Sequence, residues 1–424
     1  MRWLYLLVVY LAAPVHAAML AARSRGARDP RAPRLAQRFG FGPPVPGEPL
    51  WIHAASVGEM RPAGALVSAV RARWPDLPIL VTAFTPTGAA RAVTLGSDVT
   101  VRYLPYDLPG PVRRFLERTR PRLAIILETE LWPTLYGHCR RRGIPLIIAS
   151  ARLSSRSARR YRRFGALFRT ALRGAIVAAQ SEADAERFRA IGAEADRTQV
   201  TGNLKFDCAL PPDIGARGGR LRERYAPGRP LWVAGSTHEG EEAVVIAAHR
   251  RVREVLPEAL LVLAPRHPQR FESVAAALAA QGVACVRHSR SPDAAASAHA
   301  AVVLLDTLGE LLDFYAAADA AFVGGSLSPV GGHNLLEPAA LGLPIATGPH
   351  QFNAADVAQL LLASGAARLV HDAQELTECL ITWLAEPGER ARIGALGRSA
   401  VADNRGALER LLALIGAQLR VAGR

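Results

Sequence analysis

The chain has 424 residues, half of them hydrophobic, and a formal net charge of +15 at pH 7. It is too long for one average domain, and its apolar content is ample for folded cores, so disorder is not expected. The basic charge favours an anionic partner, which leaves nucleic acid, acidic lipid and a phosphorylated substrate as candidates. The four cysteines follow no paired spacing, which argues against a zinc site or a disulfide framework and fits a reducing compartment.

The chain begins with an apolar stretch. Residues 3–22 carry no formal charge, and about 20 such residues can span a bilayer. The residues after them are rich in arginine, which by the positive-inside rule keeps the rest of the chain in the cytoplasm. We therefore predict a membrane anchor over residues 1–22 and a basic juxtamembrane segment over 23–48. A cleaved signal peptide and a helix that lies in the membrane interface without crossing it are the alternatives.

Short apolar runs then alternate with amphipathic segments, a rhythm that is typical of βαβ units and a parallel sheet. Strands are predicted at residues 50–54, 79–83, 123–127, 145–149 and 176–179, with helices at 63–73 and 131–142. The rhythm lapses over residues 209–230, which are rich in Pro, Gly and Arg. It restarts with strands at 231–234, 260–264, 302–305 and 320–323, and a helix at 239–255.

This pattern predicts an α/β protein with two doubly wound Rossmann-like domains that face each other across a cleft. The expected boundaries are 49–208 for the N-terminal domain, 209–230 for a linker and 231–424 for the C-terminal domain. Ligands of open α/β sheets bind outside the carboxyl ends of the strands, and polar residues follow several predicted strands in both halves. The sequence therefore predicts an enzyme with its active site in the cleft.

In the N-terminal half, Glu59 follows the first of these strands and Glu128 follows the third. A carboxylate at the position of Glu59 could deprotonate an acceptor hydroxyl. The alternative is that Glu59 only pairs with the dipole of a helix start.

The C-terminal half contains the stretch GGSLSPVGGHNLLEPAALGLP at residues 324–344. Paired glycines follow a strand and let the backbone approach a ligand closely. Asn334 then opens a predicted helix that carries Leu335, Leu336 and Glu337, and the amide groups of a helix start favour a phosphate. Glu337 could accept hydrogen bonds from a ribose diol. These features predict a nucleotide-sugar site, and an ordinary turn with a capping asparagine is the alternative.

Other residues of the C-terminal half are candidates for the same ligand. Ser236 lies in a helix-capping pattern that is compatible with a phosphate site. Arg266 could clamp an anion, although the abundance of arginine makes a surface role a serious alternative. Leu308, Gly309 and Glu310 open another predicted helix, whose amide groups could meet a base or a phosphate.

Lys205 is the single lysine among the 52 basic residues of the chain. Its ammonium is a compact charge that the planar guanidinium of arginine does not reproduce, so we predict that it acts in the cleft. The sequence has no HExxH, no DxD and no Cys/His ligand spacing. We therefore predict no metal, and a departing phosphate would be met by Lys205, Arg266 and helix starts.

Ten motifs, taken together and in order, resemble those of the 3-deoxy-D-manno-octulosonate (Kdo) transferases. They are HAASVGEM, TPTG, YLPYD, ETELWP, ARLSSRS, TGNLKFD, GSTHEGEE, APRHPQRF, GGSLSPVGGHNLLEPA and TGPHQFN. The resemblance covers nearly the whole chain. It implies the GT-B fold and the transfer of Kdo from CMP-Kdo to a lipid A precursor, lipid IVA, at the cytoplasmic face of the inner membrane. It implies no cofactor besides the donor substrate.

Carried over by residue, the resemblance makes Glu59 the general base, and Glu128 and Lys205 groups that assist the transition state. It places CMP against Pro265, Arg266, Leu308, Gly309, Glu310, Asn334, Leu335, Leu336 and Glu337. The reaction is expected to invert the anomeric centre without a covalent intermediate. The segment 152–173 carries eight arginines and no acid, interleaved with apolar residues, and predicts a helix for an anionic membrane surface and a phosphorylated lipid.

Two other functions remain as alternatives. The first is a GT-B transferase or epimerase that uses a UDP donor. The second is a membrane-tethered nucleic-acid-binding protein, which the charge alone suggests, but the chain has no such motif and only 6% aromatic residues for base stacking. The number of Kdo units added and the oligomeric state are left open.

Overall fold

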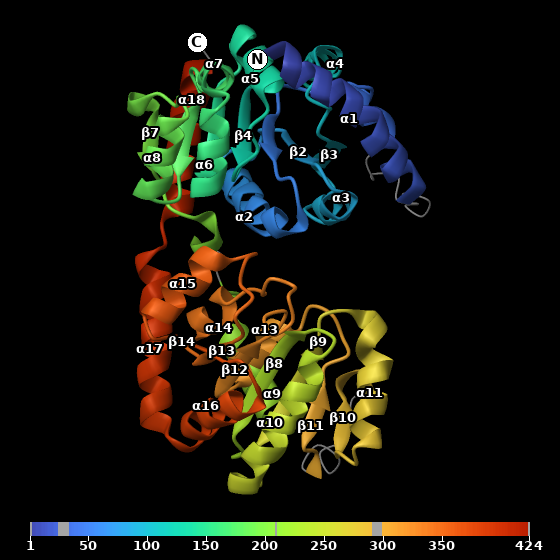
Figure 1. Ribbon diagram of the computed structural model, residues 1–424, viewed down its shortest axis with the longest axis vertical. Coiled ribbons are helices and arrows are strands. Elements are labelled where there is room, and N and C mark those ends of the chain that lie inside the picture. Colours follow the sequence, from blue (N-terminus) through green and yellow to red (C-terminus); the bar gives the residue numbers. More distant parts are fainter. Residues whose placement is uncertain (1, 24–33, 208–209, 291–298, 423–424) are drawn as a thin grey trace. The chain divides into compact units, whose positions relative to one another are not determined.

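The computed structural model describes residues 2–23, 34–207, 210–290 and 299–422. The chain forms two compact units (Figure 1). Unit 1 comprises residues 1–208 together with 404–424, and unit 2 comprises residues 209–403. Each unit is built on a seven-stranded sheet in which every strand pair is parallel. The predicted class of two parallel-sheet α/β domains is therefore confirmed.

The sheet of unit 1 has the strand order β3-β2-β1-β4-β5-β6-β7. The strands are β1 Leu50–His53, β2 Ile79–Ala83, β3 Val99–Tyr103, β4 Leu123–Leu127, β5 Leu146–Ala151, β6 Ile176–Ala179 and β7 Thr198–Val200. The helices are α1 Arg2–Arg23, α2 Val57–Arg73, α3 Pro86–Val93, α4 Pro109–Thr119, α5 Pro133–Arg141, α6 Ser155–Arg162, α7 Gly165–Leu172, α8 Glu182–Ala190 and α18 Ala407–Ala422, with 3-10 turns at Leu35–Phe39, Ala195–Arg197 and Leu204–Asp207.

Alternating side chains of β1 point to opposite faces of the sheet and enter two separate cores, as a strand buried on both faces requires. Leu50 and Ile52 pack with α2, α3 and α18, whereas Trp51 packs with α4, α5, α7 and α8. Because α18 closes the first of these cores, the segment 404–424 belongs to unit 1. The predicted C-terminal domain of 231–424 therefore extends beyond the end of unit 2, which is residue 403.

The sheet of unit 2 has the strand order β10-β11-β9-β8-β12-β13-β14. The strands are β8 Leu231–Thr237, β9 Leu260–Pro265, β10 Cys285–Arg287, β11 Val302–Leu304, β12 Ala320–Val323, β13 Ile345–Thr347 and β14 Ala367–Leu369. The helices are α9 Ile214–Tyr225, α10 Glu241–Val255, α11 Phe271–Ala280, α13 Leu311–Ala317, α14 Leu336–Leu341, α15 Ala355–Ala363, α16 Ala373–Ala385 and α17 Pro387–Asp403, with 3-10 turns at Pro268–Arg270 and His288–Arg290.

The predicted linker at 209–230 is largely folded. Its residues form α9, and Tyr225 at the end of this helix is buried in a core of unit 2 with Val233 of β8. The predicted basic helix at 152–173 is also different in the structure, because it consists of the two short helices α6 and α7. Gly165 begins the second of them, and glycine disfavours a continuous helix.

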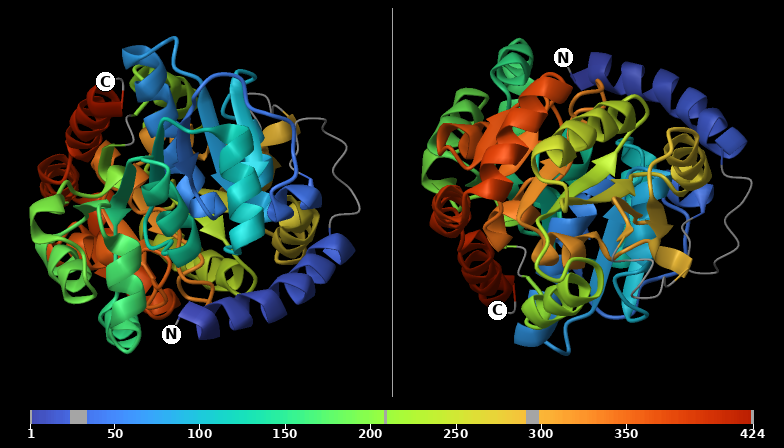
Figure 2. Two further views of the ribbon diagram at one scale, coloured as in Figure 1. Left: turned by 90° about the horizontal axis from the view of Figure 1, so that it is seen from above. Right: turned by 90° about the horizontal axis from the view of Figure 1, so that it is seen from below.

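The helix predicted at the N-terminus is present as α1, which lies along the outside of unit 1 (Figure 2). Its inner face contributes Leu6 and Ala13 to a small apolar cluster with Tyr106 and Leu108. In the part of the chain that the structure describes, no helix is both long and apolar enough to cross a bilayer. The prediction of a helix is confirmed, and the prediction of a spanning anchor is not. Residues 24–33 of the predicted basic segment lie outside the described residues.

Candidate active site

The strand orders locate one topological switch point in each sheet. In a doubly wound sheet the connections leave in opposite directions at one point, and ligands bind there, beyond the carboxyl ends of the strands. In unit 1 that point lies between β1 and β4, and in unit 2 it lies between β8 and β12. Glu59 and Glu128 follow the two strands of the first point. The glycine loop from Gly324 follows β12 at the second point.

Glu59 lies in the first turn of α2, the helix that follows β1. Its carboxylate accepts hydrogen bonds from the Ala55 amide at 2.7 Å and from the Ser56 hydroxyl at 3.0 Å. Burial and the charge of Glu128 raise the pKa of Glu59 to about 7, although these two hydrogen bonds act in the opposite direction. A carboxylate with a pKa near neutral can both take and release a proton at physiological pH.

Glu128 follows β4 directly and has a φ of 58°, in the left-handed region that few residues with a side chain adopt. This backbone conformation is costly and is often found at functional sites. The carboxylate of Glu128 lies 2.7 Å from the Lys205 ammonium, and both side chains are about one-fifth exposed, at 21% and 22%. Two of the predicted site residues, from segments 77 positions apart, therefore form an ion pair beside Glu59.

The Lys205 segment is fixed from both sides. The Leu204 amide donates to the Ser150 hydroxyl at 3.0 Å, and the Lys205 amide donates to the Asn203 side chain at 3.0 Å. Asp207 accepts from the amides of Gly406 and Leu408 at the start of α18. The ammonium is therefore presented from a rigid turn.

Glu130 and His53 complete this edge of unit 1, and sequence reasoning gave neither of them a role. The Trp132 indole donates to Glu130 at 3.1 Å. His53 is fully buried, and its Nε2 lies 3.8 Å from the Glu130 carboxylate. The other ring nitrogen of His53 contacts the Thr82 hydroxyl at 2.9 Å. The motifs HAASVGEM and ETELWP contain both residues, which is the signal that could have identified them.

In unit 2, the residues that were predicted to bind the nucleotide lie at the carboxyl ends of the strands. Ser236 lies in β8 with a φ of 58°. Pro265 ends β9, and the exposed Arg266 follows it, held by its amide to the Thr237 carbonyl at 2.9 Å. Leu308, Gly309 and Glu310 lie between β11 and α13, and Leu308 is 70% exposed.

The helix predicted after the second glycine pair is the short α14. It begins two residues after Asn334, whose side-chain oxygen accepts from the Leu336 amide at 3.1 Å. Asn334 therefore satisfies the first amide of the helix from the position before the N-cap, Leu335, whose side chain makes no capping hydrogen bond. Leu335 and Leu336 are buried, so their side chains are not available to a ligand. Glu337 is partly exposed in the first turn.

Glu241 has a role that the sequence did not predict. Its buried carboxylate accepts hydrogen bonds from the amides of Gly325, Ser326 and Leu327 at 2.7–2.8 Å, and from those of Ser328 and His238 at 3.3 and 2.9 Å. A side chain at Gly324 would bring its Cβ within 2.8 Å of this carboxylate, which explains the glycine there.

Two histidines join the glycine loop to the β8–α10 connection. Nε2 of His238 and Nε2 of His333 are 2.8 Å apart, and the rings are stacked at a centroid distance of 5.1 Å. Such a contact requires one nitrogen to donate and the other to accept, so at least one ring must be neutral. Burial lowers both pKa values, that of His333 to about 4.

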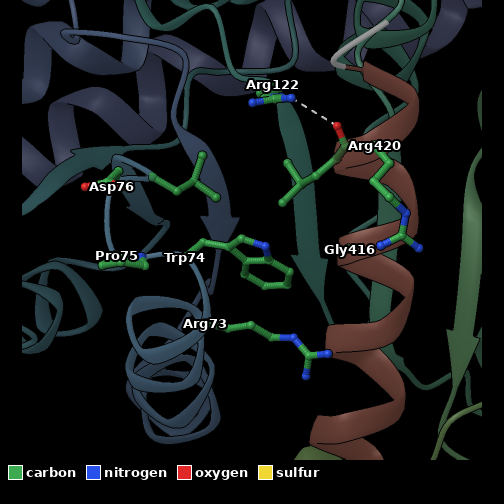
Figure 3. Close-up of a pocket in the computed structure, with 9 residues that line it drawn as sticks. Arg73, Trp74, Pro75, Asp76, Arg122, Gly416 and Arg420 are labelled. Carbon is green, nitrogen blue, oxygen red and sulfur yellow. Dashed lines mark hydrogen bonds between the residues drawn. The ribbon is translucent and has the colours of Figure 1, made fainter.

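A cavity of about 720 Å³ in unit 1 lies away from these residues, beside Trp74 and the start of β4. Figure 3 shows Arg73, Arg122 and Arg420 around it. Arg73 and Arg420 lie in the last turns of α2 and α18, where cations offset the helix dipole, and Arg122 donates to the Leu419 carbonyl at 3.1 Å. These contacts account for the arginines without a ligand.

Comparison with known proteins agrees with the family resemblance of the ten sequence motifs. A family model described as 3-deoxy-D-manno-octulosonic-acid transferase (kdotransferase) matches residues 33–208. The 3-deoxy-D-manno-octulosonic acid transferase of Haemophilus influenzae is 39% identical over 390 residues, which is 90% of each chain. The enzyme of that name from Bordetella pertussis is 40% identical over 407 residues, which is 92% of each chain.

Solved structures resemble the chain over both units. The Anabaena protein HepE in complex with UDP has a TM-score of 0.56 at 16% identity, covering 88% of this chain and 100% of that one. A putative UDP-N-acetylglucosamine 2-epimerase from Listeria monocytogenes has a TM-score of 0.56 at 14% identity, covering 88% and 96%. At these identities the likeness shows the fold alone, and it agrees with the GT-B class.

Proposed function

We propose that the donor substrate of this protein is CMP-Kdo and that its acceptor is lipid IVA. The chain belongs to the 3-deoxy-D-manno-octulosonic acid transferase family. It is therefore a glycosyltransferase that transfers Kdo in lipopolysaccharide biosynthesis. The observation that carries the proposal is the cluster of Glu59, Glu128 and Lys205 beyond β1 and β4. This cluster lies where a doubly wound sheet binds its ligand, in the unit that we assign to the acceptor.

Glu59 is the proposed general base. The acceptor hydroxyl gives its proton to the Glu59 carboxylate while its oxygen forms a bond to the anomeric carbon of Kdo. The bond from that carbon to the phosphate oxygen breaks, and its electron pair leaves with CMP. Attack from the side opposite the phosphate inverts the anomeric centre. The raised pKa of Glu59 supports this role, because a stronger base takes the proton more readily.

The Lys205–Glu128 pair is proposed to assist the transition state. Positive charge develops on the sugar and negative charge on the departing phosphate, and preorganised charged groups stabilise that separation. Glu128 supplies a carboxylate and Lys205 an ammonium, held 2.7 Å apart. The prediction that the reaction needs no metal stays a prediction.

Unit 2 is proposed to hold the donor. Arg266 would contact an anionic group of CMP-Kdo, and Glu337 would accept hydrogen bonds from the ribose. Pro265, Ser236, the turn at 308–310 and the start of α14 would surround the nucleotide. The support is their position at the carboxyl ends of β8, β9, β11 and β12.

We propose that the protein works on the cytoplasmic face of the inner membrane, with α1 lying in the lipid interface. The outer face of α1 exposes large apolar residues that are at least half accessible, namely Trp3, Leu4, Leu7, Val8, Leu11, Val15 and Met19. A helix with one packed and one apolar exposed face can lie in the plane of the membrane. Exposed arginines of α6 and α7, such as Arg159 and Arg169, would meet anionic headgroups.

The test is mass spectrometry of lipid IVA after incubation with the pure protein and CMP-Kdo, with Glu59→Gln as the inactive control. We expect products heavier by whole Kdo units, and the number of units gives the extent of transfer. A parallel reaction offers UDP-sugars. Turnover of a UDP-sugar and none of CMP-Kdo would reject the donor assignment.

A further inference from the structure

Helix α1 makes two contacts on unit 1 that lead to the proposed catalytic carboxylates. The first begins at Tyr5, whose hydroxyl donates to the Asp107 carboxylate at 2.6 Å. Asp107 is buried and also accepts from the amides of Thr134 and Leu135, at 2.8 and 2.7 Å. These amides belong to the first turn of α5, which begins at Pro133. Tyr5 therefore completes the hydrogen bonding of the residue that caps α5.

The helix start that Asp107 caps is continuous with the loop of residues 128–132, which we name the carboxylate loop. Tyr136 of α5 donates from its hydroxyl to the Glu130 carbonyl at 2.6 Å. The loop is thus attached to α5 both through the chain and through this hydrogen bond. Movement of the first turn of α5 would move Glu128 and Glu130 with it.

The second contact begins at His16 on the same face of α1. The His16 ring is stacked on Phe84 at a centroid distance of 5.3 Å, and Phe84 is stacked on Trp132 at 5.5 Å. The Trp132 indole in turn holds the Glu130 carboxylate at 3.1 Å. Nδ1 of His16 also lies 3.1 Å from the Tyr106 hydroxyl. Both routes from α1 therefore end in the carboxylate loop.

We propose that Tyr5 and His16 are positioning residues, through which α1 holds the carboxylate loop so that Glu128 and Glu130 stay beside Glu59. The helix that would lie in the lipid interface is, in this view, also a support of the active site. The inference rests on the proposed roles of Glu59 and Glu128. It adds to tethering a structural coupling between the membrane-facing helix and catalysis.

The primary test measures the loop itself, by hydrogen–deuterium exchange of the full-length protein in detergent. In the double variant Tyr5→Phe/His16→Ala, the amides of residues 128–136 should exchange faster than in the wild type. Tyr10→Phe is the matched control, because it removes the same hydroxyl from an exposed position of α1. Equal exchange at 128–136 in the double variant and the wild type would overturn the proposal.

The second test is kinetic and uses detergent-dispersed acceptor, so that tethering to a membrane does not limit the rate. The double variant should lose on the order of tenfold in kcat, because small misplacements of catalytic groups are costly, while the KM for CMP-Kdo stays unchanged. Tyr10→Phe should behave as the wild type. An unchanged kcat would overturn the proposed coupling to catalysis.

The pH profile separates positioning from a general loss of structure. The groups that face Glu59 are Glu128, paired with Lys205, and Glu130, near His53. Burial raises the pKa of Glu59, and the charges of Glu128 and Glu130 raise it further. If the loop moves away, that pKa falls, and the acid limb of kcat/KM shifts to lower pH. An unshifted limb would count against the proposal.

A wild type without transferase activity would refute the proposed function instead, and the exchange result would still decide whether α1 holds the loop.

Discussion

At the scale of a single residue, the environment of the Glu59 carboxylate is compatible with both interpretations that the sequence offered, a proposed general base and a partner of the helix start. It satisfies the Ala55 amide at the start of α2, and it also lies in the field of Glu128. The cap fixes the carboxylate in one orientation, and burial together with the neighbouring charge raises its pKa. Its place at the helix start is therefore compatible with the proposed role of Glu59 as a base.

The first prediction concerns Glu59→Gln. The amide keeps the shape of the side chain but cannot accept the acceptor proton, so kcat should fall on the order of 10²–10⁴-fold. In the wild type, kcat/KM should rise with pH through about 7, because Glu59 acts in its deprotonated form and its pKa is raised to about 7. Steady-state kinetics across pH 5–9 give both results. Glu117→Gln, at an exposed position of α4, is the control. A fully active Glu59→Gln variant would remove Glu59 from the mechanism.

The second prediction concerns Lys205, which lies 2.7 Å from Glu128. Lys205→Arg should be nearly as inactive as Lys205→Ala, because the broad guanidinium does not fit where a compact ammonium does. The loss should fall on turnover rather than on CMP binding, as expected for an interaction that is strongest in the transition state. Kinetics and calorimetry with CMP measure the two quantities. An Arg variant within about threefold of wild-type kcat would contradict the prediction. Such a change lies well below the ~1.4 kcal/mol that corresponds to a tenfold loss.

At the scale of elements, the positions of strands could be predicted from the sequence more reliably than the starts of helices, which depend on distant residues. The strand predicted at 123–127 coincides with β4, because an uninterrupted apolar run fits a strand that is buried on both faces. The predicted helices at 63–73 and 131–142 end within one residue of the ends of α2 and α5, but the first starts six residues after α2 does and the second two residues before α5 does. The start of α5 depends on capping by Asp107, a residue 26 positions before Pro133, which local pattern does not reveal.

The same limit applies to the candidate site. Glu59 and Glu128 were predictable as site candidates because both follow strands, and Lys205 because it is the single lysine of the chain and lies in one of the ten motifs. Glu241 was missed because four of its donors lie more than 80 positions further along the chain. Only the pairing of β8 with β12 brings that glycine loop to the start of α10.

The third prediction tests this loop. Glu241→Gln replaces one carboxylate oxygen by an amide group that donates, so some of the five amides lose their acceptor. We expect a lower melting temperature, with a cost of about 1–3 kcal/mol for unsatisfied buried groups, and at least tenfold weaker CMP binding. Calorimetry and thermal unfolding provide the measurements. Glu239→Gln changes a carboxylate that is 90% exposed and is the control. CMP affinity equal to that of the wild type would show that the loop does not shape the donor site.

At the scale of the whole molecule, the chain enters unit 2 once and returns to unit 1 after residue 403. The sequence did not reveal this return, because α18 is an amphipathic helix that any sheet could bury. Its position is decided by packing: Leu411, Leu412 and Ile415 enter the core that also contains Leu50 and Ile52 of β1.

The fourth prediction follows from this path. A chain that stops at residue 403 should retain CMP binding, because unit 2 is intact, while unit 1 loses stability. We expect trypsin to cleave within residues 34–207 much faster than in the full chain, and transfer to lipid IVA to be lost. Leu412→Asp in the full-length protein should have the same effect through the same core. Unit 1 as resistant to trypsin as in the full chain would mean that α18 is dispensable for its fold.

The attachment of α18 to unit 1 also sets an order of events during synthesis. On the ribosome, residues 209–403 form an uninterrupted segment and can complete their fold as soon as they emerge. The unit whose residues are made first must wait for the last helix, because Asp207 and the β1 core remain without their partners until Gly406 and the residues after it are released. The strands that precede Glu59 and Glu128 are thus translated before unit 2, yet the unit that contains them can reach its final packing only after unit 2 has emerged.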